Sequence, residues 1–150
     1  MKDKVIALTG ASEGIGRAIA LRIAAQSGTL VLAARNQAKL DAVAAECEAL
    51  GGTALAISTD VGDEAACKNL IDTTVETYGR LDHAFNNAGV AAGGAIHELE
   101  EDTWDRVLDI NLKGVWLSMK YEVRQMLEQG FGTIVNNASM LGLAGSAWAA

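Results

Sequence analysis

Residues 9–16 of the chain read Thr-Gly-Ala-Ser-Glu-Gly-Ile-Gly, and this stretch decides the fold that we expect. An apolar run of strand length, residues 4–8, precedes it, and residues 17–25 follow it with apolar side chains at helical spacing. A glycine-rich turn between a strand and a helix is typical of a phosphate site. Glycines allow positive φ and close backbone approach, while the helix start offers unpaired N–H groups and the positive end of its dipole. An ordinary loop would need one glycine, whereas this turn holds three, so we predict a phosphate-binding turn.

The composition favours a globular α/β protein. A chain of 150 residues is the size of one domain, and we assign residues 1–150 to a single domain. Half of the residues are hydrophobic, as in sheets that helices cover on both faces. The net charge of −7 and the lack of a basic run argue against nucleic acid as a partner, and no apolar stretch reaches the roughly 18 residues of a membrane span. Cys47 and Cys67 lack metal-ligand spacing and are interpreted as reduced thiols, which indicates the cytoplasm.

Strand-length and helix-length segments alternate along the chain. The expected strands are residues 4–8, 29–34, 53–58, 81–85 and 132–137. The expected helices are residues 17–25, 37–50, 64–78 and one long helical region from about 98–102 to 129. This alternation predicts a doubly wound α/β fold, with a five-stranded parallel sheet and helices on both faces. Ligands of such sheets bind where the strands end, and the candidate positions there are the glycine turn, Ala34-Arg35, Asp60-Val61, Asn86 to Gly89 and Ser139.

Five motifs, in this order along the chain, resemble those of the short-chain dehydrogenase/reductase family. The glycine turn resembles the family's T-G-x-x-x-G-[IL]-G signature and departs from the usual G-x-G-x-x-G spacing. Asn86-Asn87-Ala88-Gly89 matches the family's N-N-A-G motif residue for residue, directly after the fourth expected strand. Asp60-Val61, Asn111 with Gly114, and Ser139 match the other three motifs. The resemblance implies a Rossmann-like sheet with strand order 3-2-1-4-5 and an NAD(P)-dependent oxidoreductase that acts on a small-molecule alcohol or carbonyl substrate.

The resemblance also implies a role for each matching residue. Asp60 and Val61 would contact adenine, Asn111 would belong to a catalytic relay, and Ser139 would hydrogen-bond the substrate carbonyl or hydroxyl. Taken without the family, Asp60 is a helix cap, Asn111 a helix kink that faces solvent, and Ser139 an ordinary loop serine. The implied catalytic residues are Ser139 and Asn111. The implied cofactor-binding residues are Thr9, Gly10, Ser12, Glu13, Gly14, Ile15, Gly16, Arg35, Asp60, Val61, Asn87, Ala88 and Gly89.

Arg35 bears on the choice of cofactor. It lies about 20 residues beyond the glycine turn, where an acidic residue would bind the ribose 2′-hydroxyl of NAD. An arginine there favours a 2′-phosphate and therefore NADP over NAD, although a solvated arginine that opens a loop is the alternative. Family members that prefer NADP often carry a second basic residue inside the glycine turn, where this chain has Glu13.

The family's general acid/base is a tyrosine followed four residues later by a lysine, about thirteen residues beyond the serine. Residues 1–150 stop just short of that position, and neither Tyr78 nor Tyr121 has a lysine at that spacing. Two hypotheses stay open. The chain is the amino-terminal portion of a longer enzyme, or it is a stand-alone dinucleotide-binding module without efficient catalysis.

The remaining distinctive side chains are interpreted as structural. His83 and His97 have no companion that would suggest a metal site or a catalytic triad, so we expect no metal. Trp104, Trp116 and Met119 recur at helical spacing and are expected to be core or subunit-contact residues. The family commonly pairs subunits through the corresponding helices, so the resemblance implies a homo-oligomer.

Overall fold

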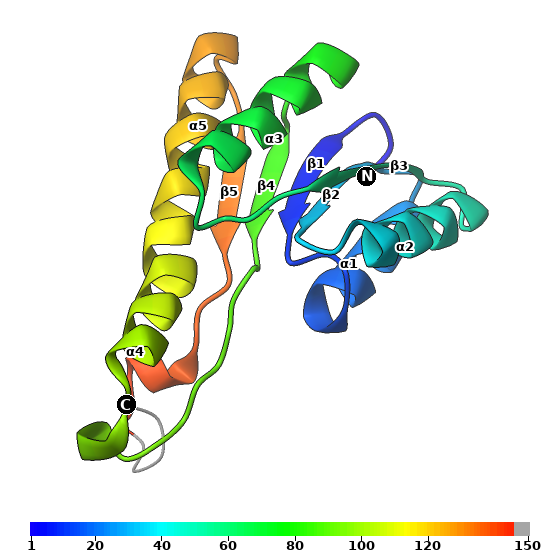
Figure 1. Cartoon of the computed structure of the whole chain (residues 1–150). Helices are drawn as coiled ribbons and strands as arrows, with labels where there is room; N and C mark the ends of the chain where they lie inside the picture. Colours follow the sequence, from blue (N-terminus) through cyan, green and yellow to red (C-terminus); the bar gives the residue numbers. More distant parts are fainter. Residues whose placement is uncertain (146–150) are drawn as a thin grey trace.

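Strands and helices alternate along the chain in the computed structural model, which describes residues 1–145 (Figure 1). The strands are β1 (Val5–Thr9), β2 (Thr29–Ala34), β3 (Thr53–Ser58), β4 (His83–Asn86) and β5 (Thr133–Asn136). The helices are α1 (Gly14–Ala24), α2 (Gln37–Ala49), α3 (Glu64–Tyr78), α4 (Glu101–Leu108) and α5 (Gly114–Gln129). Three shorter helical turns are η1 (Ile96–Glu98), η2 (Asp109–Lys113) and η3 (Met140–Gly142).

The five strands form one parallel sheet in the order β3-β2-β1-β4-β5, which confirms the predicted fold class and strand order. Alternate residues of β1 divide between the two faces. Ile6 and Leu8 pack in the cluster of buried residues that includes α1 and α2, while Val5 and Ala7 pack with α3. Because β1 is central and buried on both faces, its sequence is a continuous apolar run rather than an alternating one.

The outer strand β5 is much more exposed than β1. Val135 in its middle is 52% exposed, whereas every residue of β1 is buried. On α5, which packs beside β5, Trp116 and Leu127 are 58% and 76% exposed. The described part of the chain therefore leaves apolar side chains of α5 and β5 open to solvent.

The long helical region expected from the sequence contains a π-helical turn in its middle. The chain forms α4, then the π-helical turn η2, and then α5. Gly114, the first residue of α5, passes so close to Val61 that an added Cβ would lie 2.8 Å from the Val61 Cγ2 atom. The first helix also starts at Gly14 rather than at residue 17, because the N–H of Arg17 already donates to the carbonyl of Glu13.

Of the two predicted roles of the tryptophans, in the core or in a subunit contact, the structure does not support the core. Trp104 is 47% exposed and Trp116 is 58% exposed, while Met119 is half-buried. Helical spacing places these residues along one stripe, but it does not determine whether another element covers that stripe. A role in subunit contact stays a prediction.

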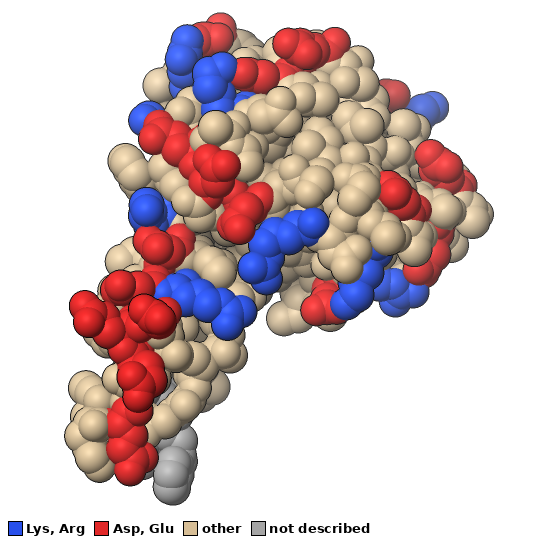
Figure 2. All heavy atoms as spheres, in the orientation of Figure 1, with Lys and Arg blue, Asp and Glu red and all other residues tan. Residues whose placement is uncertain are grey.

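Negative charge gathers on the segment that runs from η1 through α4. Figure 2 shows acidic side chains clustered over this segment, which extends away from the sheet in Figure 1. The sequence of the segment contains Glu98, Glu100, Glu101, Asp102 and Asp105. Within residues 1–145, no helix has both the length and the apolar character required to cross a membrane.

Candidate functional site

Two adjoining cavities lie at the carboxyl edge of the sheet. The first, of about 910 Å³, lies between the glycine turn and the ends of β2 and β3. The second, of about 980 Å³, lies between the ends of β4 and β5, η2 and α5. Both are lined by Asn87, Ala88, Gly89, Val90 and Asn137, so one ligand can extend from the first cavity into the second.

The glycine turn closes tightly on itself at one wall of the first cavity. Gly10 and Gly14 adopt φ values of +66° and +54°, a region that favours glycine. An added Cβ at Gly16 would lie 2.1 Å from the carbonyl oxygen of Gly10, so a side chain at this position would displace the turn. Four residues of this turn line the cavity, Gly10, Ser12, Glu13 and Ile15, whereas Gly14 and Gly16 do not.

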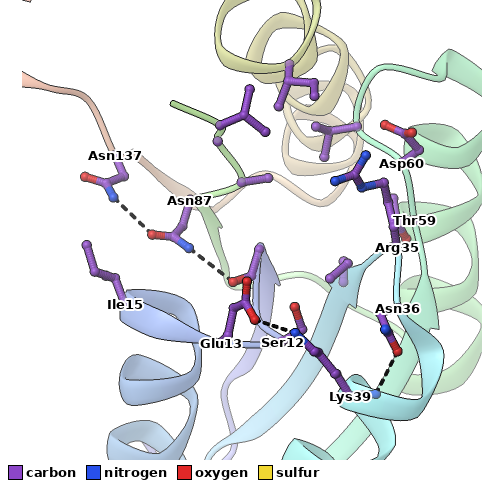
Figure 3. A pocket seen from close by; sticks show the side chains of 18 of the residues that line it. Ser12, Glu13, Ile15, Arg35, Asn36, Lys39, Thr59, Asp60, Asn87 and Asn137 are labelled. Carbon is purple, nitrogen blue, oxygen red and sulfur yellow. Dashed lines mark hydrogen bonds and ion pairs between the residues drawn. The ribbon is translucent and has the colours of Figure 1, made fainter. Parts of the chain in front are cut away.

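Thr9 and Asn87 connect the ends of β1, β4 and β5. The buried Thr9 hydroxyl accepts hydrogen bonds from the N–H groups of Asn87 (3.0 Å) and Ala88 (3.1 Å). The Asn87 side chain donates to the carbonyl of Thr9 (3.2 Å). It also accepts from the Asn137 amide (3.0 Å), as Figure 3 shows. Thr9 does not line either cavity, and its hydrogen bonds position the loop. Its contact with a cofactor stays a prediction.

The far wall of the first cavity carries Arg35, Asp60 and Val61, as predicted. The Asp60 Oδ1 atom accepts from the N–H of Gly62 (3.0 Å), and the carboxylate stays exposed at the cavity. The Arg35 side chain is exposed and points toward Asp60 in Figure 3, and within residues 1–145 it makes no ion pair.

Glu13 pairs with a residue that the sequence analysis missed. The Lys39 Nζ atom, in the first turn of α2, lies 2.6 Å from the Glu13 Oε2 atom (Figure 3). This hydrogen bond and the positive charge of Lys39 hold the pKa of Glu13 below its ordinary value. The only signal in the sequence was the position of Lys39, one helical turn after Arg35.

Asn111 and Ser139, the predicted catalytic residues, both line the second cavity. The Asn111 side chain accepts from the N–H of Val90 and donates to its carbonyl, each at 2.8 Å. Ser139 is exposed, and its hydroxyl accepts from the N–H of Leu141 (3.2 Å). An added Cβ at Gly89 would lie 3.4 Å from the Asn111 Oδ1 atom, which is an ordinary van der Waals contact.

A buried carboxyl group behind the second cavity also escaped sequence analysis. Glu122 of α5 is 1% exposed and accepts from the Asn86 amide (3.0 Å), which also donates to Asn136 (2.9 Å). Burial raises the pKa of Glu122 to about 7. A glutamate in an amphipathic helix usually faces solvent, so its sequence carries no signal for this arrangement.

The tyrosines of the chain lie away from this site. Tyr121 donates its hydroxyl to the Glu64 carboxylate (2.8 Å), and neither Tyr78 nor Tyr121 lines either cavity. Within residues 1–145, the cavities therefore contain the predicted serine and asparagine but no tyrosine.

Comparison with known proteins identifies the family. The family model described as short chain dehydrogenase matches residues 4–150. A 3beta-hydroxysteroid dehydrogenase of Mediterraneibacter gnavus is 41% identical over 144 residues, which are 95% of this chain and 52% of that protein. A cyclohexanol dehydrogenase of an Acinetobacter species is 40% identical over 144 residues, covering 95% of this chain and 57% of that protein.

The solved structure of NAD+-bound xylitol dehydrogenase is similar with a TM-score of 0.94 at 36% identity, over 97% of this chain and 56% of that chain. The chain thus spans little more than half the length of these relatives. The matches confirm the family that the five motifs predicted. The chain belongs to the short-chain dehydrogenase/reductase family.

Proposed function

We propose that residues 1–150 form the dinucleotide-binding domain of an NAD(P)-dependent oxidoreductase, which transfers hydride between the nicotinamide and an alcohol or carbonyl substrate. The observation that carries this proposal is the pair of adjoining cavities, with the glycine turn at one end and Ser139 at the other. The relatives are named as dehydrogenases of a steroid and of cyclohexanol, which supports a small-molecule substrate.

The residues of the first cavity fit the adenosine half of such a cofactor. The close approach of Gly16 to Gly10 leaves room for backbone alone, which is the condition for a pyrophosphate to approach the turn and the start of α1. Asp60 offers a carboxylate to the adenine amino group, and Val61 lies beside it. Ser12, Ile15, Ala88 and Gly89 complete the walls along which the cofactor would lie.

The second cavity fits the reacting half. The nicotinamide supplies the hydride when the cofactor is bound, and the exposed Ser139 hydroxyl would donate a hydrogen bond to the substrate oxygen. Asn111 would hold the loop at Val90 in place, because its amide oxygen and its amide nitrogen both form hydrogen bonds with the Val90 backbone. Neither side chain delivers a proton at neutral pH, so residues 1–150 by themselves are expected to bind the cofactor without efficient catalysis.

The NADP preference rests on Arg35. The adjacent Ala34 offers nothing to a 2′-hydroxyl, while the Arg35 guanidinium, which forms no ion pair with any residue from 1 to 145, can bind a 2′-phosphate. A charge-assisted hydrogen bond of this kind contributes about 1.5–3 kcal/mol, roughly one to two decades in affinity. The similar xylitol dehydrogenase structure is bound to NAD+, which is a property of that protein.

Calorimetry with NADP+ and NAD+ tests the binding site and its preference together. We expect NADP+ to bind more tightly, and Arg35→Ala to remove the difference while Arg124→Ala, an exposed change on α5, leaves it intact. Equal affinities in the wild-type chain would refute the preference, and no binding of either cofactor would refute the dinucleotide site. A carbonyl-reductase assay on a sample of verified intact mass then separates the enzyme from the binding module.

We propose that the protein forms a homo-oligomer, which the exposed apolar side chains of α5 and β5 support. We also propose the cytoplasm, supported by Cys47 and Cys67, which are buried and unpaired as expected for a reducing compartment.

A further inference from the structure

Glu13 and Lys39 form an ion pair at the mouth of the first cavity. Lys39 projects from α2, and Glu13 belongs to the glycine turn, so the pair joins two walls of the cavity. The Lys39 side chain is 55% exposed and the Glu13 side chain is 72% exposed. Arg35 lines the same cavity (Figure 3). The carboxylate and the ammonium group therefore line the same cavity as Arg35, the residue proposed to bind the 2′-phosphate.

The Glu13–Lys39 pair is well suited to exchange one anion for another. Ion pairs between exposed side chains contribute little to stability, so separating this one costs little. A phosphate monoester carries close to two negative charges and three acceptor oxygens, whereas the Glu13 carboxylate carries one charge. A phosphate at the cavity mouth would therefore compete with Glu13 for the Lys39 ammonium group.

We infer that Lys39 is a second specificity-determining cation for the 2′-phosphate of NADP, and that Glu13 is the counter-ion which the phosphate displaces. The inference rests on the proposed dinucleotide site and extends it to a residue outside the glycine turn. The glycine turn has Glu13 at the position where family members that prefer NADP often carry a second basic residue. In this chain, Lys39 supplies that positive charge from α2 instead. Glu13 lowers the affinity for the phosphate, because it repels the phosphate and occupies Lys39.

Two small nucleotides isolate the contribution of the 2′-phosphate. Adenosine 2′,5′-bisphosphate and 5′-AMP differ only in that group, and both lack the nicotinamide. The variants are Lys39→Gln and Glu13→Gln, each of which removes a charge and keeps a side chain of similar length. Lys68→Gln is the matched control, because Lys68 is also half exposed (50%) and paired with a carboxylate, that of Asp72, but lies on α3.

Calorimetry on the purified chain should give opposite results for the two variants. We expect Lys39→Gln to weaken binding of the bisphosphate about tenfold and Glu13→Gln to strengthen it about threefold, with 5′-AMP and the Lys68→Gln control changed less than twofold. Equal effects on both nucleotides, or no effect of Lys39→Gln on the bisphosphate, would overturn the inference while 5′-AMP binding still supports the dinucleotide site. If the wild-type chain binds neither nucleotide, the proposed function fails, and the inference fails with it.

Discussion

Glu122 carries a carboxyl group into the interior of the protein, where its main partner is the amide of Asn86. The Asn86 Oδ1 atom is also buried and has no partner among the described residues. A neutral Glu122 carries an O–H donor and avoids the cost of an unpaired buried charge, which explains why burial raises its pKa.

This single side chain should make the stability of the protein depend on pH. Its pKa is about 7 in the folded chain against an ordinary value of 4.5, so the folded state binds the proton more tightly between these two values. The contribution of this group to the free energy of unfolding is fully present below pH 4.5. It falls by about 3 kcal/mol as the pH rises from 4.5 through 7. Urea denaturation from pH 4.5 to 8 measures this loss.

Glu122→Gln keeps an acceptor for Asn86 without a charge, so its free energy of unfolding should lack this decrease and exceed that of the wild type at pH 8. Glu128→Gln provides the control, because Glu128 lies on the same helix but is 61% exposed. The same pH dependence in the wild type and in Glu122→Gln would contradict the assignment.

Among the elements, the π turn η2 links the helical region to the second cavity. It carries Asn111 to the loop at Val90, where the side chain makes two hydrogen bonds of 2.8 Å. A π turn inserts one residue more than the α-helical repeat and so changes the direction of the side chains that follow. Asn111 thus reaches the loop after β4, while Gly114 still packs against Val61.

Removal of the Asn111 side chain should loosen that loop more than the fold. Each hydrogen bond contributes about 0.5–1.5 kcal/mol, so Asn111→Ala should speed amide exchange at Val90 roughly five- to hundredfold. Exchange in β1 should stay unchanged, because β1 lies in the buried centre of the sheet. Asn69→Ala, an exposed change on α3, is the control, and unaltered protection at Val90 in Asn111→Ala would show that Asn111 does not hold the loop.

At the scale of the whole molecule, the neighbouring elements α5 and β5 both expose apolar side chains to solvent. Val123 and Leu127 of α5 are 39% and 76% exposed, and Val135 of β5 is 52% exposed. Figure 2 shows a cluster of acidic side chains over the segment from η1 to α4. Large exposed apolar surfaces mark interaction sites, and an outer strand can pair with another chain.

We expect this surface to join copies of the chain into an oligomer. Light scattering coupled to size exclusion should give a mass above that of the 15.6 kDa chain. Leu127→Glu should reduce the mass, because it places a charge in the proposed contact, whereas Ile96→Glu on η1, where Ile96 is 77% exposed, should not. A monomeric wild type at working concentration would refute the proposed oligomer.

Much of the fold followed from local patterns. The apolar run of β1, the glycine turn and the helical spacing after it are short-range properties, because strand periodicity and positive φ are set within a few residues. The helix caps Asn36 and Asp63 are also local features, because their side chains accept hydrogen bonds from the N–H groups of Lys39 and Ala65, only two or three residues away. The sequence also predicted that the motifs after the strands lie at one edge of the sheet, because the carboxyl ends of parallel strands meet at the same edge.

The tertiary structure decided which side chains meet across that edge. The pairing of Lys39 with Glu13 depends on how α2 packs beside the glycine turn, and the bridge from Thr9 through Asn87 to Asn137 depends on the sheet order. The burial of Glu122 depends on the rotation of α5 about its axis, which η2 changes and which no local pattern encodes. Contacts between residues distant in sequence depend on how whole elements pack, so helical or strand spacing alone cannot predict them.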